Sequence, residues 1–207
     1  SPPYPTSPLP MVFNRKSPKR VLSPEAAMLR LAQLCSASEM CRQEAVDKCL
    51  QWGLEEQQAH EVADRLVGER FIDDARYAPL YVRDKARFSG WGPIKVRTNL
   101  IQKGVYPNLA DDAIEAFRTG FPHEWDQILC RALKSKLRTA RQDDPQKLYA
   151  SLVRFAMQRG FTFDTIRPAL RTVLNEAQAE ASDHETIEEN SEEIGGLEND
   201  DFVPNGF

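Results

Sequence analysis

The chain has 207 residues, of which 41% are hydrophobic and 28% are charged, and its formal net charge is -4. These proportions are ordinary for a soluble globular protein. No apolar run approaches the ~20 residues that span a bilayer, and the proline-rich start from Ser1 to Pro5 lacks the apolar stretch of a secretion signal. We therefore expect a cytoplasmic protein with no membrane contact.

Helix start signals punctuate the chain from Ser23 onward. Ser23-Pro24 suits a first helix, because serine caps an orphan amide and proline fits the first helical position. The apolar spacing between signals is helical, as from Ala59 to Leu66, and no convincing strand alternation appears. Further start signals stand at Asp73, Gly92-Pro93, Tyr106-Pro107, Phe121-Pro122 and Asp144-Pro145.

One local pattern occurs three times and ends in Gly53, Gly104 or Gly160. Each glycine follows a helical stretch and precedes an apolar residue, which is typical of a helix end whose backbone turns left-handed. The glycines lie somewhat over fifty residues apart, long enough for three short helices. They therefore mark repeats.

These signals predict an all-α fold of nine or so helices, arranged as three tandem three-helix repeats. Stacked repeats of this kind form an elongated, curved body with a long exposed surface. The predicted repeats cover residues 23–70, 71–120 and 121–175, after a flexible N-terminal segment at 1–22. Pro79 and Pro168 fall inside expected helices, where each removes an amide donor, so we expect kinks there.

The end of the chain, residues 176–207, is acidic. It contains eleven Asp or Glu and no Lys or Arg, which leaves Ser1–Asn175 with a formal charge of +7. With two adjacent glycines and few large apolar residues, we expect this tail to be disordered. It serves solubility in one interpretation, and in another it competes with nucleic acid for the basic body.

Common catalytic signatures are missing: there is no phosphate-binding glycine loop, zinc-protease motif, serine-hydrolase elbow or dinucleotide fingerprint. We expect no enzyme activity and no cofactor. The four cysteines, Cys35, Cys41, Cys49 and Cys130, show no C-x-x-C spacing, so we expect reduced thiols and no metal site. Asp73 and Asp74 resemble paired catalytic carboxylates, but a helix start favours a capping role.

A row of arginines follows the helix predicted from Asp73 to Phe88. Arg76, Arg83 and Arg87 share one face with Leu80, since offsets of seven and eleven residues return to nearly the same azimuth. Guanidinium groups in line suit phosphates and carboxylates, whereas in a purely solvated face they pair with nearby acids such as Asp84. We expect the opposite side, with Ala75, Ala78, Val82 and Ala86, to pack.

The next helix, Pro93 to Lys103, places Lys95, Asn99 and Gln102 on one side. We expect Ile94, Leu100 and Ile101 to pack on the other. Arg97 lies toward the packed side, where it is expected to pair with Asp73 or Asp74.

Trp91 lies between Gly90 and Gly92 in the corner that joins these two helices. Tryptophan in such a place is more often a core side chain with a polar handle, but an exposed indole in a basic corner anchors partners or stacks on bases. Tyr77, Tyr81 and Phe88 follow helical spacing, and we expect them in the core.

The central stretch resembles the RecX family, regulators of the RecA recombinase. Weaker similarities flank it, and the resemblance covers about Ser23 to Asn175. The residues that carry it are Phe71 to Ala78, then Tyr81-Val82-Arg83, Gly92-Pro93 and Lys103-Gly104-Val105.

The resemblance implies a non-enzymatic regulator that binds RecA filaments on single-stranded DNA and limits their growth, ATPase, strand exchange and co-protease activity. The implied partners are RecA and single-stranded DNA, bound directly or through the filament, and we expect a monomer. Our hypothesis assigns the contact surface to Arg76, Arg83, Arg87, Lys95 and Lys103, with Trp91 as an anchor, and structural roles at helix ends to Asp73, Asp74, Gly53, Gly92, Gly104 and Gly160. The outward orientation of these rows is an assumption, because a modest rotation of each helix would change it.

Two other functions fit the same residues. In the first, the helix from Pro93 reads duplex DNA in the major groove, as in a helix-turn-helix regulator. In the second, the repeats form an α-helical adaptor for another protein, and the basic charge is incidental.

Overall fold

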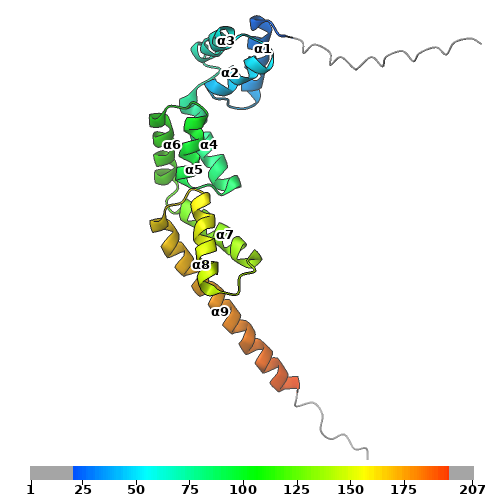
Figure 1. Cartoon of the computed structure of the whole chain (residues 1–207), viewed down its shortest axis with the longest axis vertical. Coiled ribbons are helices and arrows are strands. Elements are labelled where there is room, and N and C mark those ends of the chain that lie inside the picture. Colours follow the sequence, from blue (N-terminus) through cyan, green and yellow to red (C-terminus); the bar gives the residue numbers. More distant parts are fainter. Residues whose placement is uncertain (1–20, 196–207) are drawn as a thin grey trace, which may run out of the picture. The chain divides into compact units, whose positions relative to one another are not determined.

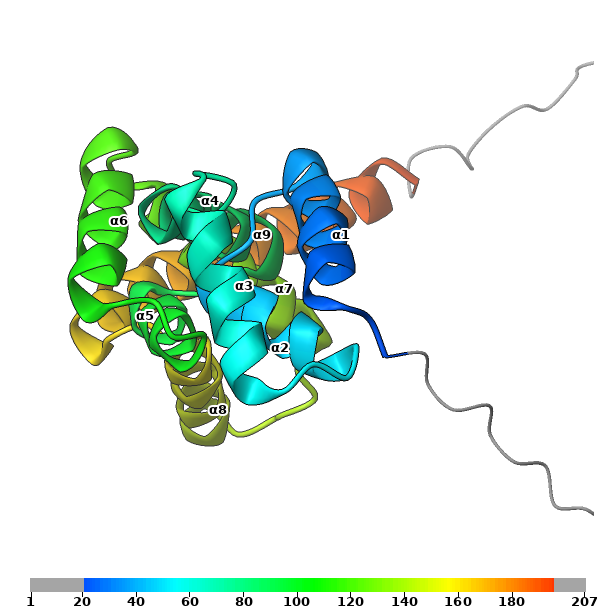
Figure 2. The same ribbon diagram turned by 90° about the horizontal axis from the view of Figure 1, so that it is seen from above.

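The computed structural model describes residues 21–195, with side chains placed as far as residue 183. Over this range the chain forms nine helices and no strand (Figure 1, Figure 2), which confirms the predicted all-α fold. The helices are α1 (Pro24–Ala37), α2 (Arg42–Gln51), α3 (Glu56–Gly68), α4 (Asp74–Ser89), α5 (Pro93–Gln102), α6 (Pro107–Gly120), α7 (Glu124–Thr139), α8 (Pro145–Gln158) and α9 (Phe163–Gly195).

Capping side chains set several of the helix starts. Ser23 Oγ accepts a hydrogen bond from the amide of Ala26 at 3.2 Å and caps α1. Asp73 Oδ1 accepts from the amide of Ala75 at 2.9 Å and caps α4. Asp144 Oδ1 caps α8 through the amide of Gln146, also at 2.9 Å. Each side chain satisfies a donor that the first helical turn leaves unpaired.

The chain divides into two compact units. Unit 1 comprises the described residues of Ser1–Ala78 together with Ile101–Leu109, and unit 2 those of Pro79–Leu100 together with Ala110–Phe207. The division passes through α4, α5 and α6, so it does not follow the three predicted repeats, whose boundaries stay a prediction. In unit 1, α1, α2 and α3 pack around Leu31, Val46 and Leu66. In unit 2, α7, α8 and α9 pack together, and Leu133 and Leu152 are fully buried.

Three expected core residues are exposed, and all three lie at helix ends. Phe88, in the last turn of α4, is 86% exposed, and Ile94, in the first turn of α5, is 50% exposed. Ala75, in the first turn of α4, is also exposed. Helical spacing predicts the side of a helix that packs, but not how far along the axis the neighbouring elements extend. Tyr77 and Tyr81, further from the ends, are buried as expected.

The prediction of a disordered tail from residue 176 is wrong as far as residue 195. The last helix, α9, continues to Gly195. No glycine or proline interrupts the chain from Ala169 to Ile194, and Ala and Glu are frequent there. These residues have high helix propensity, which acidic composition does not cancel. Residues 1–20 and 196–207, the rest of the two segments expected to be flexible or disordered, lie outside the described range.

Both interior prolines lie within helices. Pro79 is in α4 and Pro168 in α9, each near the start of the helix. Neither helix ends at its proline, although each proline removes one amide donor from the helix. The kinks expected at both positions stay a prediction.

Candidate nucleic-acid interface

Three of the five predicted contact cations take part in ion pairs. In unit 1, Arg76 Nε lies 2.5 Å from Glu39 Oε1, and Lys103 Nζ lies 2.7 Å from Glu44 Oε1. In unit 2, Arg87 binds both carboxylate oxygens of Glu124, at 2.6 and 3.1 Å. The hydrogen bond from Arg87 lowers the pKa of Glu124. These cations are satisfied by neighbouring acids, although not by Asp84.

The expected ion pair between Arg97 and Asp73 or Asp74 is wrong. Arg97 Nε lies 2.6 Å from Asp111 Oδ1, so it joins α5 to α6. Asp73 caps its own helix, and Asp74 accepts a hydrogen bond from the amide of Arg42 at 2.9 Å, which caps α2. Both carboxylates thus stabilise helix starts, and burial raises the pKa of Asp74.

The remaining two predicted cations are Arg83 and Lys95, both in unit 2. Within the described residues neither makes an ion pair. Arg83 is exposed on α4, and Lys95 is half-buried on α5. The ammonium of Lys95 lies 4.6 Å from the centroid of the Trp91 ring. Trp91 therefore sits beside a cation and is half-buried, instead of filling the core.

A second lysine approaches the same indole. Lys85 Nζ lies 5.0 Å from the Trp91 ring centroid, and it also lies 5.5 Å from the ring of Tyr81. Arg159, between α8 and α9, donates from Nη1 to the carbonyl of Ser89 at 2.5 Å, at the start of the same loop. We call this group, Lys85, Trp91, Lys95 and Arg159, the Trp91 corner.

Backbone contacts between two loops build the Trp91 corner. The amide of Gly92 donates to the carbonyl of Arg159 at 2.6 Å, and the amide of Ile94 donates to the carbonyl of Gly160 at 3.1 Å. The indole of Trp125 donates to the carbonyl of Trp91 at 3.1 Å. The α4–α5 loop is therefore held against the α8–α9 loop, which brings together residues that lie far apart in the sequence.

Two of the predicted corner glycines meet at this contact. A Cβ on Gly92 would lie 2.5 Å from the carbonyl oxygen of Gly160, and a Cβ on Gly160 would lie 2.5 Å from the amide nitrogen of Lys95. Gly160 also has a φ of 94°, as its place at a helix end leads one to expect. Both positions therefore require glycine, and together they position Lys95.

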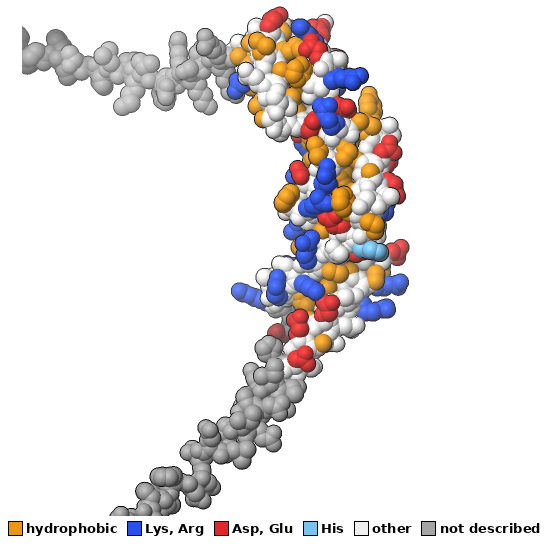
Figure 3. Space-filling model, turned by 180° about the vertical axis from the view of Figure 1, so that it is seen from behind, with side chains coloured by type: hydrophobic (Ala, Val, Ile, Leu, Met, Phe, Trp, Pro, Cys, Tyr) orange, Lys and Arg blue, Asp and Glu red, His pale blue; other side chains and the backbone are white. Residues whose placement is uncertain are grey.

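The Trp91 corner concentrates positive charge. Three cations gather around one loop, and within the described part of the chain none of them is ion-paired with a carboxylate. Cations over an aromatic ring gain from its quadrupole, but their mutual repulsion favours a bound anion. Figure 3 shows that Lys and Arg side chains on the visible face are interspersed with apolar and acidic ones. The arrangement suits phosphate groups.

Sequence reasoning missed Lys85 and Arg159. Lys85 lies on α4 between Arg83 and Arg87 but not on their face, so it does not belong to the arginine row. Arg159 precedes Gly160 in the repeated helix-end pattern, where a basic residue also precedes Gly104. That repetition is the signal that could have drawn attention to it.

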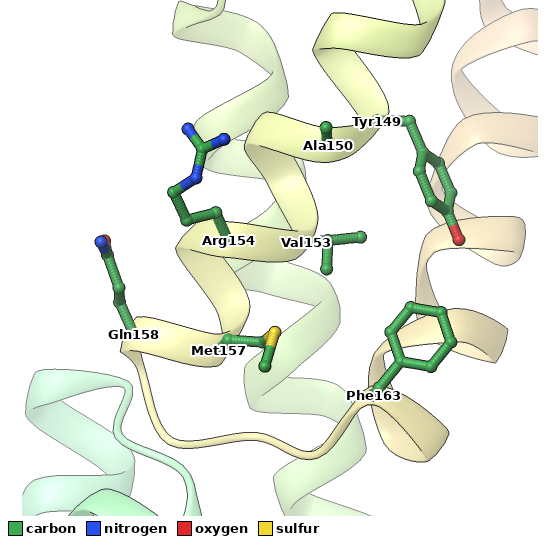
Figure 4. A pocket seen from close by; sticks show the side chains of 7 residues that line it. All are labelled: Tyr149, Ala150, Val153, Arg154, Met157, Gln158 and Phe163. Carbon is green, nitrogen blue, oxygen red and sulfur yellow. The ribbon is translucent and has the colours of Figure 1, made fainter.

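An open apolar hollow lies between α8 and α9 in unit 2 (Figure 4). Its lining is mainly apolar, with Arg154 and Gln158 among the polar side chains, and consists of Tyr149, Ala150, Val153, Arg154, Met157, Gln158 and Phe163. Its lining contains no His, Cys, Asp or Glu. The hollow therefore offers apolar contact area and no acid, base or nucleophile pair.

The cysteines are not activated. Burial raises the pKa of all four thiols, that of Cys41 to about 11. A thiol of raised pKa is a poor nucleophile and a poor metal ligand at neutral pH. In the described residues, no group of three or more His, Cys, Asp or Glu side chains lies close enough to hold a metal ion, and no helix is long and apolar enough to traverse a lipid bilayer.

The contact between Lys103 and Glu44 predicts a pH-dependent stability. Burial alone would raise the pKa of Glu44, but the hydrogen bond and charge of Lys103 lower it below its usual value. This carboxylate stabilises the fold above its unfolded pKa and loses that effect as pH falls through its folded pKa. Lys103→Gln should cost about 1–2 kcal/mol at pH 7, measured by urea unfolding.

At pH 3 the same substitution should cost less, because Glu44 is then increasingly protonated in both proteins. Lys147→Gln, which removes an exposed lysine with no ion pair in the described structure, serves as the control and should show no such pH dependence. An equal cost of Lys103→Gln at both pH values would contradict the role given to the pair.

Two family models match the chain. The one described as RecX, second three-helix domain, matches residues 73–114, and the one described as RecX, third three-helix domain, matches residues 124–170. Regulatory protein RecX of Vibrio parahaemolyticus is 30% identical over 159 residues, 77% of this chain and 96% of that protein. Its counterpart from Vibrio campbellii is 32% identical over 148 residues, 72% of this chain and 89% of that protein.

Solved structures show the same fold. The crystal structure of RecX from Lactobacillus salivarius superposes with a TM-score of 0.60 at 21% identity and covers 72% of this chain and 96% of that one. A second crystal structure, of regulatory protein RecX, has a TM-score of 0.61 at 22% identity, with 70% and 71% covered. At 21% and 22% identity, the similarity to these two structures shows the fold alone.

Proposed function

Because the chain belongs to the RecX family of regulatory proteins, we propose that it regulates the RecA recombinase. It binds RecA and RecA filaments on single-stranded DNA and limits filament growth, and thereby ATP hydrolysis, strand exchange and co-protease activity. It acts as a monomer and without catalysis of its own. The observation that carries this proposal is the similarity to named regulatory proteins over nearly their whole length.

We place the main contact surface of unit 2 at the Trp91 corner, together with Arg83. Lys85, Lys95 and Arg159 approach one loop and have no carboxylate partner within the described residues, so each is available to a phosphate or an acidic surface without breaking an ion pair. Arg76, Arg87 and Lys103 stay in the proposal as weaker contributors. Each must first exchange a carboxylate for the partner, which offsets most of the gain.

Trp91, which is half-buried, adds an aromatic element to this surface. Aromatic side chains in basic grooves stack on bases of single strands or fill pockets on protein partners. In either use the two lysines over the ring must shift when a partner covers it. Lysines and arginines that neutralise phosphates release the counterions of those phosphates. For this reason we expect binding at this surface to depend strongly on salt.

The duplex-reading alternative has less support from α5. Arg97 is paired with Asp111, and Thr98 and Asn99 donate to carbonyls of their own helix, at 2.9 Å each. A recognition helix needs such side chains free to reach base edges. The adaptor alternative predicts little affinity for nucleic acid at low salt.

The test is RecA ATP hydrolysis on single-stranded DNA, measured while the protein is titrated in. Inhibition at substoichiometric amounts is expected, because one regulator on a growing filament affects many RecA subunits. A parallel measurement on single-stranded and duplex DNA without RecA separates the alternatives. Unchanged hydrolysis at equimolar protein would refute the proposal, and a discrete duplex footprint without RecA would favour the helix-turn-helix function.

A further inference from the structure

One face of α7 presents a row of basic side chains. Arg131, Lys134 and Arg138 follow one another at intervals of three and four residues, which places them on the same side of the helix. All three are exposed. The opposite side of α7 is buried and includes Leu129 and Leu133. We call these three residues the basic row.

The basic row has few acidic neighbours along α7 itself. The acids of this helix, Glu124 and Asp126, are in its first turn, and Glu124 is held by Arg87. Among the described residues, Arg131 and Arg138 make no ion pair. Three cations in line on a solvated face create a local positive potential that attracts a polyanion.

The only ion pair of the basic row within the described structure is made with α9. Lys134 Nζ lies 2.5 Å from Glu176 Oε2, and both side chains are about half exposed. The hydrogen bond that Lys134 donates to Glu176 raises the pKa of Lys134, and the charge of Glu180 contributes in the same direction. Glu176 begins the acidic half of α9, residues 176–195, which contains eight Asp or Glu and no Lys or Arg.

The ion pair between Lys134 and Glu176 fixes where the acids of α9 begin relative to the basic row. Short loops connect α7 to α8 and α8 to α9, so α7 and α9 run in the same direction, and the two helices pack together. Glu176, Glu180 and Asp183 lie on one face of α9 at intervals of four and three residues. Among the described side chains of α9, Val173 is the last that is fully buried, and Glu176, Glu180 and Asp183 are exposed.

We propose that the basic row on α7 binds the phosphate backbone of single-stranded nucleic acid, and that the acidic half of α9 competes with the nucleic acid for this row. Carboxylates on a helix present a line of negative charge, as phosphates do. Displacement of Glu176 frees Lys134, and the row then offers three cations to the incoming strand.

The dimensions favour a phosphate backbone as the partner. Arg131 and Arg138 are separated by seven residues, or about 10 Å along the helix at 1.5 Å per residue. A strand of DNA carries a phosphate about every 3.4 Å along a B-form axis, so the row spans roughly three phosphates. The arginine fork matches phosphate oxygens in pairs.

This inference deepens the proposed function, since it names nucleic acid as a direct partner and an internal acidic segment as its regulator. It is nevertheless tested without RecA. If the protein does not bind nucleic acid, the proposed inhibition of RecA is not contradicted. If it does not inhibit RecA, the proposed binding of nucleic acid to the basic row is not contradicted.

The experiment measures binding of the full-length protein to a fluorescent oligo-dT by anisotropy, over a series of salt concentrations. Glu176→Gln with Glu180→Gln should tighten binding about three- to tenfold at low salt, because two competing surface charges are removed. Adding Arg131→Gln and Arg138→Gln to that variant should reverse the gain and lower the salt slope by about 0.7 for each phosphate that is no longer neutralised.

The matched control is Glu25→Gln with Glu61→Gln, which changes the formal charge equally at two exposed acids on α1 and α3. It should leave the affinity within about twofold of the parent, because screening weakens distant charges. An equal gain from both acid pairs would show that only net charge matters and would overturn the competition. Retained tight binding after removal of the two arginines, or binding to polyglutamate and not to oligo-dT, would overturn the basic row as a nucleic-acid site.

Discussion

Replacing Lys85, Lys95 and Arg159 together by glutamine should raise the concentration needed to inhibit RecA ATP hydrolysis by at least about tenfold. Three cations without carboxylate partners in the described structure converge on the Trp91 corner. Each phosphate that they no longer neutralise lowers the salt slope by roughly 0.7, so the slope should fall by up to about 2. The measurement is the inhibition curve at several salt concentrations, with the binding of the regulator to RecA–DNA filaments followed in parallel.

The control for this triple variant is Arg65→Gln, Arg97→Gln and Arg118→Gln. Each of these three arginines is already paired with a carboxylate. The control removes three positive charges, as the triple variant does, but leaves the residues of the Trp91 corner unchanged. The control should inhibit nearly as well as the parent. Since Arg159 also donates to the carbonyl of Ser89, the double variant Lys85→Gln, Lys95→Gln separates binding from folding. Full inhibition by a folded double variant would remove the corner from the contact surface.

Among the described glycines of unit 2, Gly160 is the one whose substitution by alanine should destabilise the fold most. The new Cβ would lie 2.5 Å from the amide nitrogen and the Cβ of Lys95, and the φ of 94° is unfavourable for any residue with a side chain. A strained backbone together with a steric clash should cost about 2–4 kcal/mol. Urea unfolding followed by tryptophan fluorescence measures this, because Trp91 and Trp125 both belong to the affected unit.

Gly120→Ala is the matched control in the same unit. Gly120 ends α6 without a positive φ, and nothing lies within 4 Å of an added Cβ. Alanine has the higher helix propensity, so this variant should be neutral or more stable by up to about 1 kcal/mol. If the two variants unfold at the same urea concentration, the close contact between the two loops is not maintained in solution.

The expected loss of stability in Gly160→Ala and the expected loss of RecA inhibition in the triple variant are connected through Lys95. The clash at Gly160 falls on the residue that supplies one of the corner cations, so a folded Gly160→Ala protein should also inhibit RecA less well. The positions of Gly92 and Gly160 thus link the stability of unit 2 to the geometry of its candidate interface.

The sequence by itself determined the helical class, most helix starts and the family resemblance. These features are local: a cap at Ser23 or Asp144, a glycine at a helix end and a spacing of three or four residues act within a few residues of the chain. Local spacing also indicated which side of a helix packs. It did not predict that Ala75, Phe88 and Ile94, at helix ends, are exposed, because their exposure depends on neighbouring elements. In residues 176–195 the acidic composition predicts disorder, but the helix propensity of the residues prevails and α9 continues.

Only the tertiary structure decided which charges are available. Arg76, Arg87, Arg97 and Lys103 are satisfied by acids from other helices or loops, at separations of 37, 37, 14 and 59 residues, which no local pattern reveals. The Trp91 corner likewise arises because the α4–α5 loop contacts the α8–α9 loop, about 70 residues away. Whether a charged side chain binds a partner or a neighbour depends on distance in space, and folding alone sets that distance.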